Sequence, residues 1–228
     1  MRVRVLGKSP SWQDAGGACS GYLIEDGATS LLLDCGNGVF SKLRLYRDYV
    51  TLDAVLISHL HADHFLDLVP FAYALTYAPR QQPVPVDRWP GTEDPARPRL
   101  IAPRGATETF RRVVGAWGNE DLIENAFRIE EYGADAQPAV GPLRFKFRSV
   151  PHFLETFAIR VGDPLSARGE IAGTIRLERG DWQVETRTQT RLTATAEAFR
   201  IEATLEALEG DARVWEQSWD CTVPRDLV

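Results

Sequence analysis

The stretch ISHLHADHFLDLVP, residues 57–70, contains three of the four histidines of the chain. It places His59, His61, Asp63 and His64 within six residues, directly after AVLIS (54–58), an apolar run typical of a buried strand. Such polar side chains cannot all be buried without partners, because each unpaired buried polar group costs roughly 1–3 kcal/mol. Neutral imidazoles and a carboxylate are ligands of Zn²⁺ and related ions, so the cluster predicts a metal site.

The spacing of the cluster suggests how ions would be shared. Side chains two residues apart in an extended segment point the same way, so His59 and His61 can share one ion. A turn after them would direct Asp63 and His64 toward a second ion. A satisfied core histidine explains any single member but not the group, and a solvated turn would favour Lys, Glu and Gly over imidazole.

The composition limits the class of protein. Of the 228 residues, 44% are hydrophobic and 25% charged, as in soluble globular proteins, and no apolar run approaches the roughly 20 residues of a membrane span. The three cysteines (Cys19, Cys35 and Cys221) are scattered, and the first residues lack the apolar region of a signal peptide, so we expect a cytoplasmic protein. A net charge of -6 offers no general attraction for RNA, which stays open as a substrate but is not favoured.

Local patterns before residue 163 predict alternating strands and helices around the histidines. A Pro-rich surface loop is expected over residues 79–98. The expected helices are residues 37–50, 65–78 and 107–117, with Pro70 interrupting the second helix or starting a turn of it. The expected strands are residues 1–7, 21–26, 29–36, 54–58, 99–105, 142–151 and 156–161.

The pattern changes after residue 163, where the chain has no Lys, His or Met. Apolar residues there recur at every second position, as in Phe199, Ile201, Ala203 and Leu205. This period, with the turn sequences ERGD and EGDA, predicts antiparallel hairpins with one face toward a core. We therefore expect two domains, residues 1–165 and 166–228. Trp215 and Trp219 would share one strand face, which favours a core or an interface.

The motif H-x-H-x-D-H after a strand resembles the signature of the metallo-β-lactamase fold. LLLDCGNG (31–38) and VPHFLETFAIRV (150–161) are similar to the ribonuclease Z and cyclic-phosphodiesterase branch of that superfamily. The resemblance covers residue 1 to about residue 162. It implies an α+β fold in which a partial αββα sandwich is followed by an antiparallel β segment.

The resemblance also implies roles for individual residues. His59, His61 and His152 would hold one zinc ion, and Asp63 with His64 would begin a second site that stays open. Zinc lowers the pKa of a bound water to roughly 7, and Asp63 could accept the proton of that water. Asp34 would orient the histidine loop, since ligand imidazoles need a hydrogen-bonded partner.

The sequence departs from the family after the third histidine. No histidine follows His152, and nothing after Val161 resembles the motif that supplies a bridging aspartate. The nearest carboxylate, Asp163, lies in a Gly-Pro turn. We expect a zinc-dependent hydrolase of small phosphodiesters or esters that uses metal-activated water. A non-catalytic or impaired metal-binding protein is the alternative, an incomplete or fused product without dedicated activity is a third, and a homodimer that supplies missing ligands stays open.

Two further sequence patterns have an ordinary structural interpretation. Residues 166–228 resemble the C-terminal tail of X-Pro dipeptidyl-peptidase-like α/β-hydrolases, a region that carries no catalytic residue in those enzymes. GACSG (17–21) matches a nucleophile-elbow pattern around Cys19, but a strand rather than a helix is expected to follow it, so a Gly-rich turn is favoured.

Overall fold

The computed structural model describes residues 1–84, 86–88, 90–152, 154–161, 168–180, 182–195 and 197–224. The chain divides into two compact units, Met1–Arg160 and Val161–Val228. This division lies a few residues before the boundary expected at residue 165. Within the described ranges, no helix is long and apolar enough to cross a membrane.

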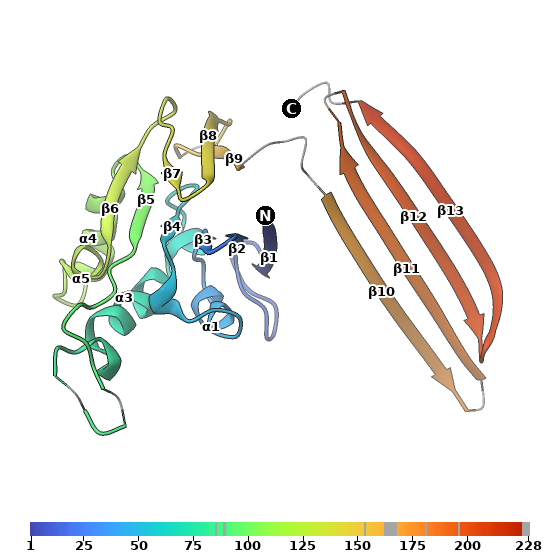
Figure 1. The fold of residues 1–228 in the computed structure, drawn as a ribbon, viewed down its shortest axis with the longest axis horizontal. Coiled ribbons are helices and arrows are strands. Elements are labelled where there is room, and N and C mark those ends of the chain that lie inside the picture. The colour runs from blue at the N-terminus through green and yellow to red at the C-terminus, as the bar shows by residue number, and fades with distance from the viewer. Residues whose placement is uncertain are drawn as a thin grey trace. The chain divides into compact units, whose positions relative to one another are not determined.

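The first unit is built on a six-stranded sheet with the strand order β1-β2-β3-β4-β5-β6 (Figure 1). The first three strands are antiparallel, and β3 to β6 run parallel. Five strands confirm the prediction, whereas β6 was missed because its sequence RIEEY carries three charges and lacks a period of two. The strands are β1 (Arg2–Gly7), β2 (Gly21–Asp26), β3 (Thr29–Leu33), β4 (Ala54–Leu56), β5 (Arg99–Pro103) and β6 (Arg128–Tyr132).

Helices cover one face of this sheet. Phe71, Phe110 and Phe127 from the helical segments join strand residues such as Leu32 and Val55 in a single buried cluster. Pro70 lies in the first turn of α3, where the backbone N–H groups have no partner within the helix, so it starts the helix and does not break it. The helices are α1 (Val39–Leu43), α2 (Ala62–Phe65), α3 (Leu68–Tyr77), α4 (Ala106–Gly115) and α5 (Leu122–Ala126), with 3₁₀ turns η1 (Tyr49–Thr51) and η2 (Pro79–Gln81).

A small three-stranded sheet packs on the other face. It contains β7 (Ala139–Val140), β8 (Leu143–Ser149) and β9 (Phe157–Val161) in that order. Phe145 of β8 is buried, and Phe147 stacks on Tyr132 of β6 with ring centroids 4.0 Å apart. The first unit therefore has three layers, namely helices, the six-stranded sheet and the three-stranded sheet.

The second unit is a four-stranded antiparallel sheet of consecutive hairpins. Two of its turns contain Gly180 and Gly210, whose φ angles of 60° and 58° suit glycine. The strands are β10 (Arg168–Arg179), β11 (Trp182–Ala194), β12 (Ala198–Glu209) and β13 (Ala212–Pro224). These strands and the layers of the first unit confirm the expected α+β class with an antiparallel C-terminal segment.

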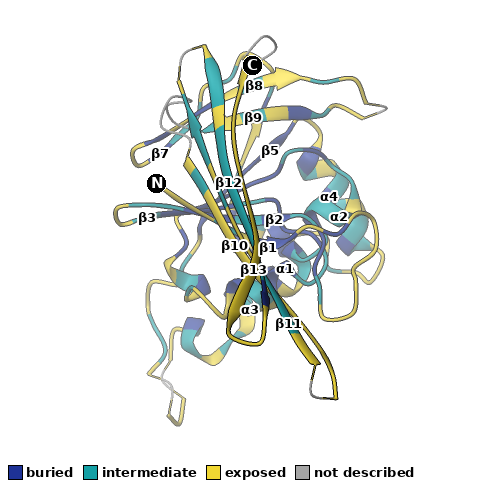
Figure 2. Ribbon diagram, turned by 90° about the vertical axis from the view of Figure 1, so that its right-hand side faces the viewer, coloured by how far each residue is buried: buried dark blue, intermediate teal, exposed yellow. Residues whose placement is uncertain are grey.

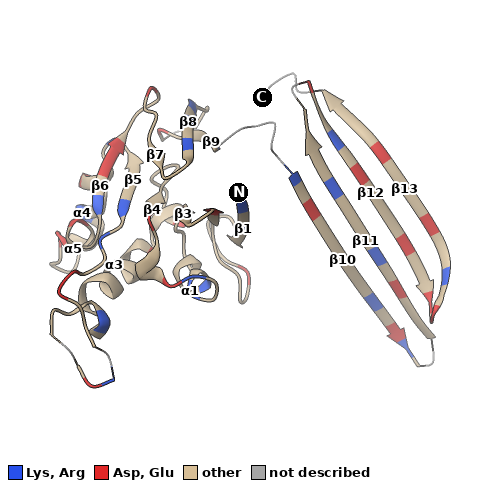
Figure 3. Cartoon of the chain, in the orientation of Figure 1, with Lys and Arg blue, Asp and Glu red and all other residues tan. Residues whose placement is uncertain are grey.

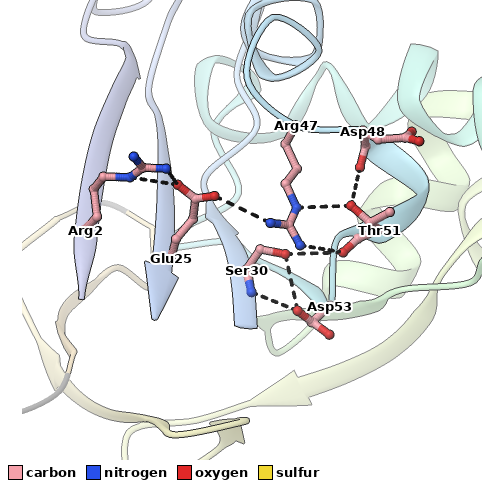
Figure 4. Close-up of polar contacts among 7 residues, drawn as sticks. All are labelled: Arg2, Glu25, Ser30, Arg47, Asp48, Thr51 and Asp53. Atoms are coloured by element: carbon pink, nitrogen blue, oxygen red, sulfur yellow. Dashed lines mark hydrogen bonds and ion pairs between the residues drawn. The ribbon is translucent and has the colours of Figure 1, made fainter. Parts of the chain in front are cut away.

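A polar network fixes the starts of β3 and β4 (Figure 4). Asp53 precedes β4, and its carboxylate accepts hydrogen bonds from the backbone N (2.8 Å) and Oγ (3.2 Å) of the fully buried Ser30. The single hydroxyl proton of Ser30 is shared with the carbonyl oxygen of Thr51, 3.3 Å from Oγ, and Arg47 connects Thr51 to Glu25 of β2. The two strands are thus joined by an Asp–Ser pair at the end opposite to the histidines.

Candidate metal centre

The end of β4 is held rigidly. All three residues of β4 and the following Ile57 are buried, and the phenol of Tyr132 donates a hydrogen bond of 2.8 Å to the carbonyl of Ile57. Burial raises the pKa of Tyr132 far above its ordinary value, so the phenol stays a donor at any ordinary pH. Ser58 and His59 therefore leave the sheet from a fixed point.

The histidine loop is joined to the segment after β3 by backbone contacts. Cys35 N donates to His64 O at 2.7 Å, and Asp67 N donates to Cys35 O at 3.0 Å. Gly36 passes so close that a Cβ there would lie 1.8 Å from Asp63 O, which excludes every other residue type. Asp67 also connects the histidine loop to α1, because its carboxylate accepts a hydrogen bond of 2.9 Å from Phe40 N in the first turn of that helix.

Three imidazoles converge at this place. One ring nitrogen from each of His59, His61 and His152 lies within 4.8 Å of the other two. His59 Nε2 and His61 Nδ1 are 3.2 Å apart. His152 comes from the turn between β8 and β9, so the cluster joins the six-stranded sheet to the three-stranded sheet.

Asp34 holds the histidine loop in place through hydrogen bonds to Ser58 and His64. Its side chain is 4% exposed, and its φ of 58° is tolerated by aspartate better than by most residues. One carboxylate oxygen accepts from Ser58 N at 2.7 Å. The other accepts from Ser58 Oγ at 2.9 Å and from His64 Nδ1 at 2.7 Å.

These hydrogen bonds assign the tautomers of two rings. His64 Nδ1 must carry a proton to donate to Asp34, so in the neutral ring the lone pair lies on His64 Nε2. Ser58 has a single hydroxyl proton and gives it to Asp34, so at 3.1 Å it accepts from His59 Nδ1. His59 Nε2 therefore carries a lone pair directed toward His61 Nδ1.

The charges around the cluster favour the neutral form of His59. Burial lowers the pKa of His59 to about 4, and the neighbouring imidazoles add to this effect against the opposing charge of Asp34. Burial also works to lower the pKa of His64, but the hydrogen bond and charge of Asp34 outweigh it and raise that pKa. A neutral, oriented imidazole is the form that binds a metal.

Asp63 and His64 lie beside the three-histidine group. Asp63 Oδ2 is 3.4 Å from His64 Nε2. Among the described residues, the histidines His59, His61 and His152 form the one group of three or more potential ligands within bonding reach of a common ion. Asp163 lies outside the described residues.

Other candidates fit a structural role. Cys19 is buried in a turn directly before β2, as the Gly-rich interpretation of its motif predicts, and burial raises the pKa of its thiol. The sequence interpretation missed Ser58 and Tyr132. Ser58 stands between the buried strand and the first histidine, which is the single local signal that could have indicated its role.

A central parallel strand that ends in convergent imidazoles, between helices and a second sheet, defines a class of mixed helix-and-sheet folds with a metal site to which many hydrolases belong. Residues 14–188 match the metallo-beta-lactamase superfamily, and the chain belongs to this superfamily. Its members are typically metal-dependent hydrolases. The match extends past the expected boundary into β11. The resemblance of residues 166–228 to peptidase tails stays a prediction.

Named relatives agree with this assignment. The chain is 46% identical to the probable metallo-hydrolase YhfI of Bacillus subtilis over 74 residues, which are 32% of this chain and 30% of YhfI. It is 32% identical to the uncharacterized protein Mb1374 of Mycobacterium bovis over 173 residues, 73% of this chain and 57% of that protein. A ribonuclease Z of Myxococcus xanthus is 32% identical over 84 residues, 37% of this chain and 27% of the enzyme. The chain thus spans at most 57% of the length of these relatives.

A solved structure shares the fold. The crystal structure of YhfI from Bacillus subtilis aligns with a TM-score of 0.57 and 26% identity. The alignment covers 72% of this chain and 59% of YhfI.

Proposed function

We propose that the protein is a zinc-dependent hydrolase of phosphodiester or ester bonds. The observation that carries the proposal is the convergence of His59, His61 and His152, with the lone pair of His59 Nε2 fixed toward His61 Nδ1. Three neutral imidazoles are a donor set that suits catalytic zinc, so the residues present fit the ion.

Each residue of the site has a distinct task in this proposal. His59, His61 and His152 would hold the ion, which would lower the pKa of a bound water and so supply a nucleophile at neutral pH. Asp63 would accept the proton of the water at its carboxylate, which is turned toward His64 Nε2. Asp34 would hold the tautomers of His59 and His64 through Ser58. A second ion, if bound, would take Asp63 and His64.

The substrate class rests on chemistry and on the relatives. The ion would supply a nucleophile suited to phosphodiesters and esters, and the named relatives include a metallo-hydrolase and a ribonuclease Z. We favour a small substrate, because the net charge of -6 gives no general attraction for RNA. One fold hosts many reactions, so the particular substrate must come from assay.

One observation favours a second candidate, a metal-binding protein without turnover. In the part of the chain that the structure describes, Asp63 and His64 have no third ligand beside them. A second ion held by two ligands would bind weakly. This candidate predicts a bound ion and no hydrolysis.

The test combines metal content with turnover on the full chain. Protein purified without chelator is analysed for zinc and then assayed with bis(p-nitrophenyl) phosphate and p-nitrophenyl acetate, with and without chelator. We expect bound zinc, and hydrolysis that is lost with chelator and in His61→Ala but kept in Asp53→Asn. Zinc without hydrolysis would establish the second candidate, and no zinc would overturn both.

A further inference from the structure

The sheet β10–β13 of the second unit has two chemically different faces. Residues that are paired across the four strands share a face, so the register assigns every side chain to one of them. The ion-pair face includes Arg176, Glu185, Arg187, Arg200, Glu202, Glu206, Arg213, Glu216 and Asp220. The apolar face includes Ile171, Ile175, Leu177, Trp182, Val184, Leu192, Phe199, Ile201, Ala203, Leu205, Trp215, Trp219, Cys221 and Val223.

The charged side chains of the ion-pair face pair with one another. Arg200 pairs with Asp220 at 2.6 Å, and Arg213 pairs with Glu206 at 3.0 Å and with Glu216 at 2.8 Å. Figure 3 shows the alternating positive and negative bands along these strands. Solvated and mutually paired charges need no cover, so this face can remain in water.

The apolar face lacks any such cover within its own sheet. Ile171 is 71% exposed and Ile175 is 65% exposed, while Trp182, Trp215 and Trp219 are each about half exposed. In Figure 2 the strands β10–β13 are coloured almost entirely as intermediate or exposed. A single sheet with one apolar face is half of a two-layer structure and requires a second layer.

The size of the face is that of a stable interface. The strands contain 12 or 13 residues each, which corresponds to a length of about 40 Å at 3.3 Å per residue. Four strands about 4.8 Å apart give an area of about 760 Å². Two such faces in contact would bury about 1,500 Å² in total, within the usual range for specific protein–protein interfaces.

The first unit has no comparable surface among its described residues. Its exposed large apolar side chains are spread over several separate elements, such as Val3 and Val5 on β1, Tyr77 on α3 and Trp117 after α4. Among the described residues, the one surface that matches an apolar face of this extent is the same face of another copy.

We propose that the second unit forms a homodimer in which two copies pack their apolar faces together as an eight-stranded β-sandwich. Sheets pack in this way with about 10 Å between them and strands roughly 30° apart, which suits twisted antiparallel strands. A two-fold axis places the same residues of the two copies opposite one another, so a charge at the centre of the face would repel its own copy. The polar side chains at the centre are Thr188 and Gln217, and neither is charged.

The test measures the mass of the full chain in solution and uses pairs of adjacent residues that point to opposite faces. Trp219→Glu and Ile175→Glu place charges on the apolar face, and Ser218→Glu and Thr174→Glu place them on the ion-pair face as matched controls. All four side chains are at least partly exposed, so we expect the variants to fold. Circular dichroism checks this. We expect a two-chain mass by sedimentation equilibrium at about 10 µM, because interfaces of this size range from micromolar to tighter affinities. Trp219→Glu and Ile175→Glu should weaken the dimer by roughly 100-fold or more through the burial of unpaired charge, and the controls should not.

Cys221 gives an independent readout, because it is the exposed cysteine and lies on the apolar face, whereas Cys19 and Cys35 are buried. Its reaction with Ellman's reagent should slow as the protein concentration rises through the dimerisation range. A chain that is monomeric at all concentrations, or an oligomer that persists in both apolar-face variants, would overturn the proposal. These outcomes are independent of zinc content and turnover.

Discussion

The replacement Asp34→Asn tests whether the carboxylate behind the histidine loop fixes the ligand tautomers. Asparagine has the same shape and tolerates the φ of 58° at this position. It offers one oxygen where Asp34 offers two. Ser58 N can only donate, so the amide oxygen must face it, and the amide NH₂ then faces Ser58 Oγ and His64 Nδ1.

The consequence is a change of tautomer in both rings. His64 Nδ1 becomes an acceptor and its proton moves to Nε2. Ser58 Oγ accepts from the amide and donates to His59 Nδ1, so the proton of His59 also moves to Nε2. The nitrogens that faced the metal site would then carry protons in the metal-free protein.

The hydrogen bonds give the size of the effect. Three bonds to a carboxylate become bonds to a neutral amide, a loss of about 1 kcal/mol each, and relief from burying a charge offsets part of this loss. We expect the metal-free protein to lose about 1–2 kcal/mol of unfolding free energy. Zinc affinity should fall about 10- to 100-fold, the usual effect of removing a partner of a metal ligand.

Competition titration with a zinc chelator measures the affinity, denaturant unfolding measures the stability, and histidine ¹⁵N spectra report the tautomers. Asp53→Asn is the matched control, because Asp53 makes the same kind of bonds to Ser30 at the far end of the same two strands. It should lose no more stability than Asp34→Asn, because one amide oxygen can accept both bonds from Ser30, and zinc affinity should not change. The reasoning is refuted if folded Asp34→Asn binds zinc within about twofold of the parent chain, a difference of about 0.4 kcal/mol.

Further predictions concern the loop, the small sheet, pH and metal removal. Gly36→Ala should cost about 1–3 kcal/mol and most of the bound zinc, because its Cβ would meet Asp63 O at 1.8 Å; unchanged metal content would contradict this. Phe145→Ala should cost about 3–5 kcal/mol in denaturant unfolding, since the side chain is 1% exposed. Burial raises the pKa of Glu131, but two backbone N–H groups at the start of α4 outweigh it and hold that pKa below its ordinary value. Its stabilisation is therefore present above the pKa of the unfolded chain and lost as pH falls through the folded pKa, so Glu131→Gln should destabilise the protein more at pH 7 than in acid; a constant difference would argue against it. Chelator should lower the melting temperature. The unfolding free energy should fall by about 2.7 kcal/mol if free zinc was 100 times its dissociation constant.

Local patterns were sufficient for the elements that carry the site. The apolar run before His59 predicted β4, and the crowding of polar ligands after it predicted a metal site. The antiparallel strands after residue 163 were predicted from apolar residues at every second position. These features depend on a few neighbouring residues, which is why a sequence shows them directly.

Features that depend on contacts between distant residues could not be predicted from local sequence patterns. The convergence of His152 with His59 and His61 joins residues from two different sheets, and it was expected from family resemblance alone. The links through Ser58 and Tyr132 depend on hydrogen bonds across the fold. The five-residue helix α5 is too short to show a period.

The position of His152 on a different sheet from the other two histidines has a consequence for folding. An ion held by His61 and His152 would act as a cross-link that closes a loop of roughly ninety residues in the chain. Closing a loop of that length removes entropy from the unfolded chain and would be worth about 4–5 kcal/mol by the arithmetic used for disulfides. An ion bound there would then also stabilise the fold as a cross-link, and zinc depletion would lower the amount of folded protein.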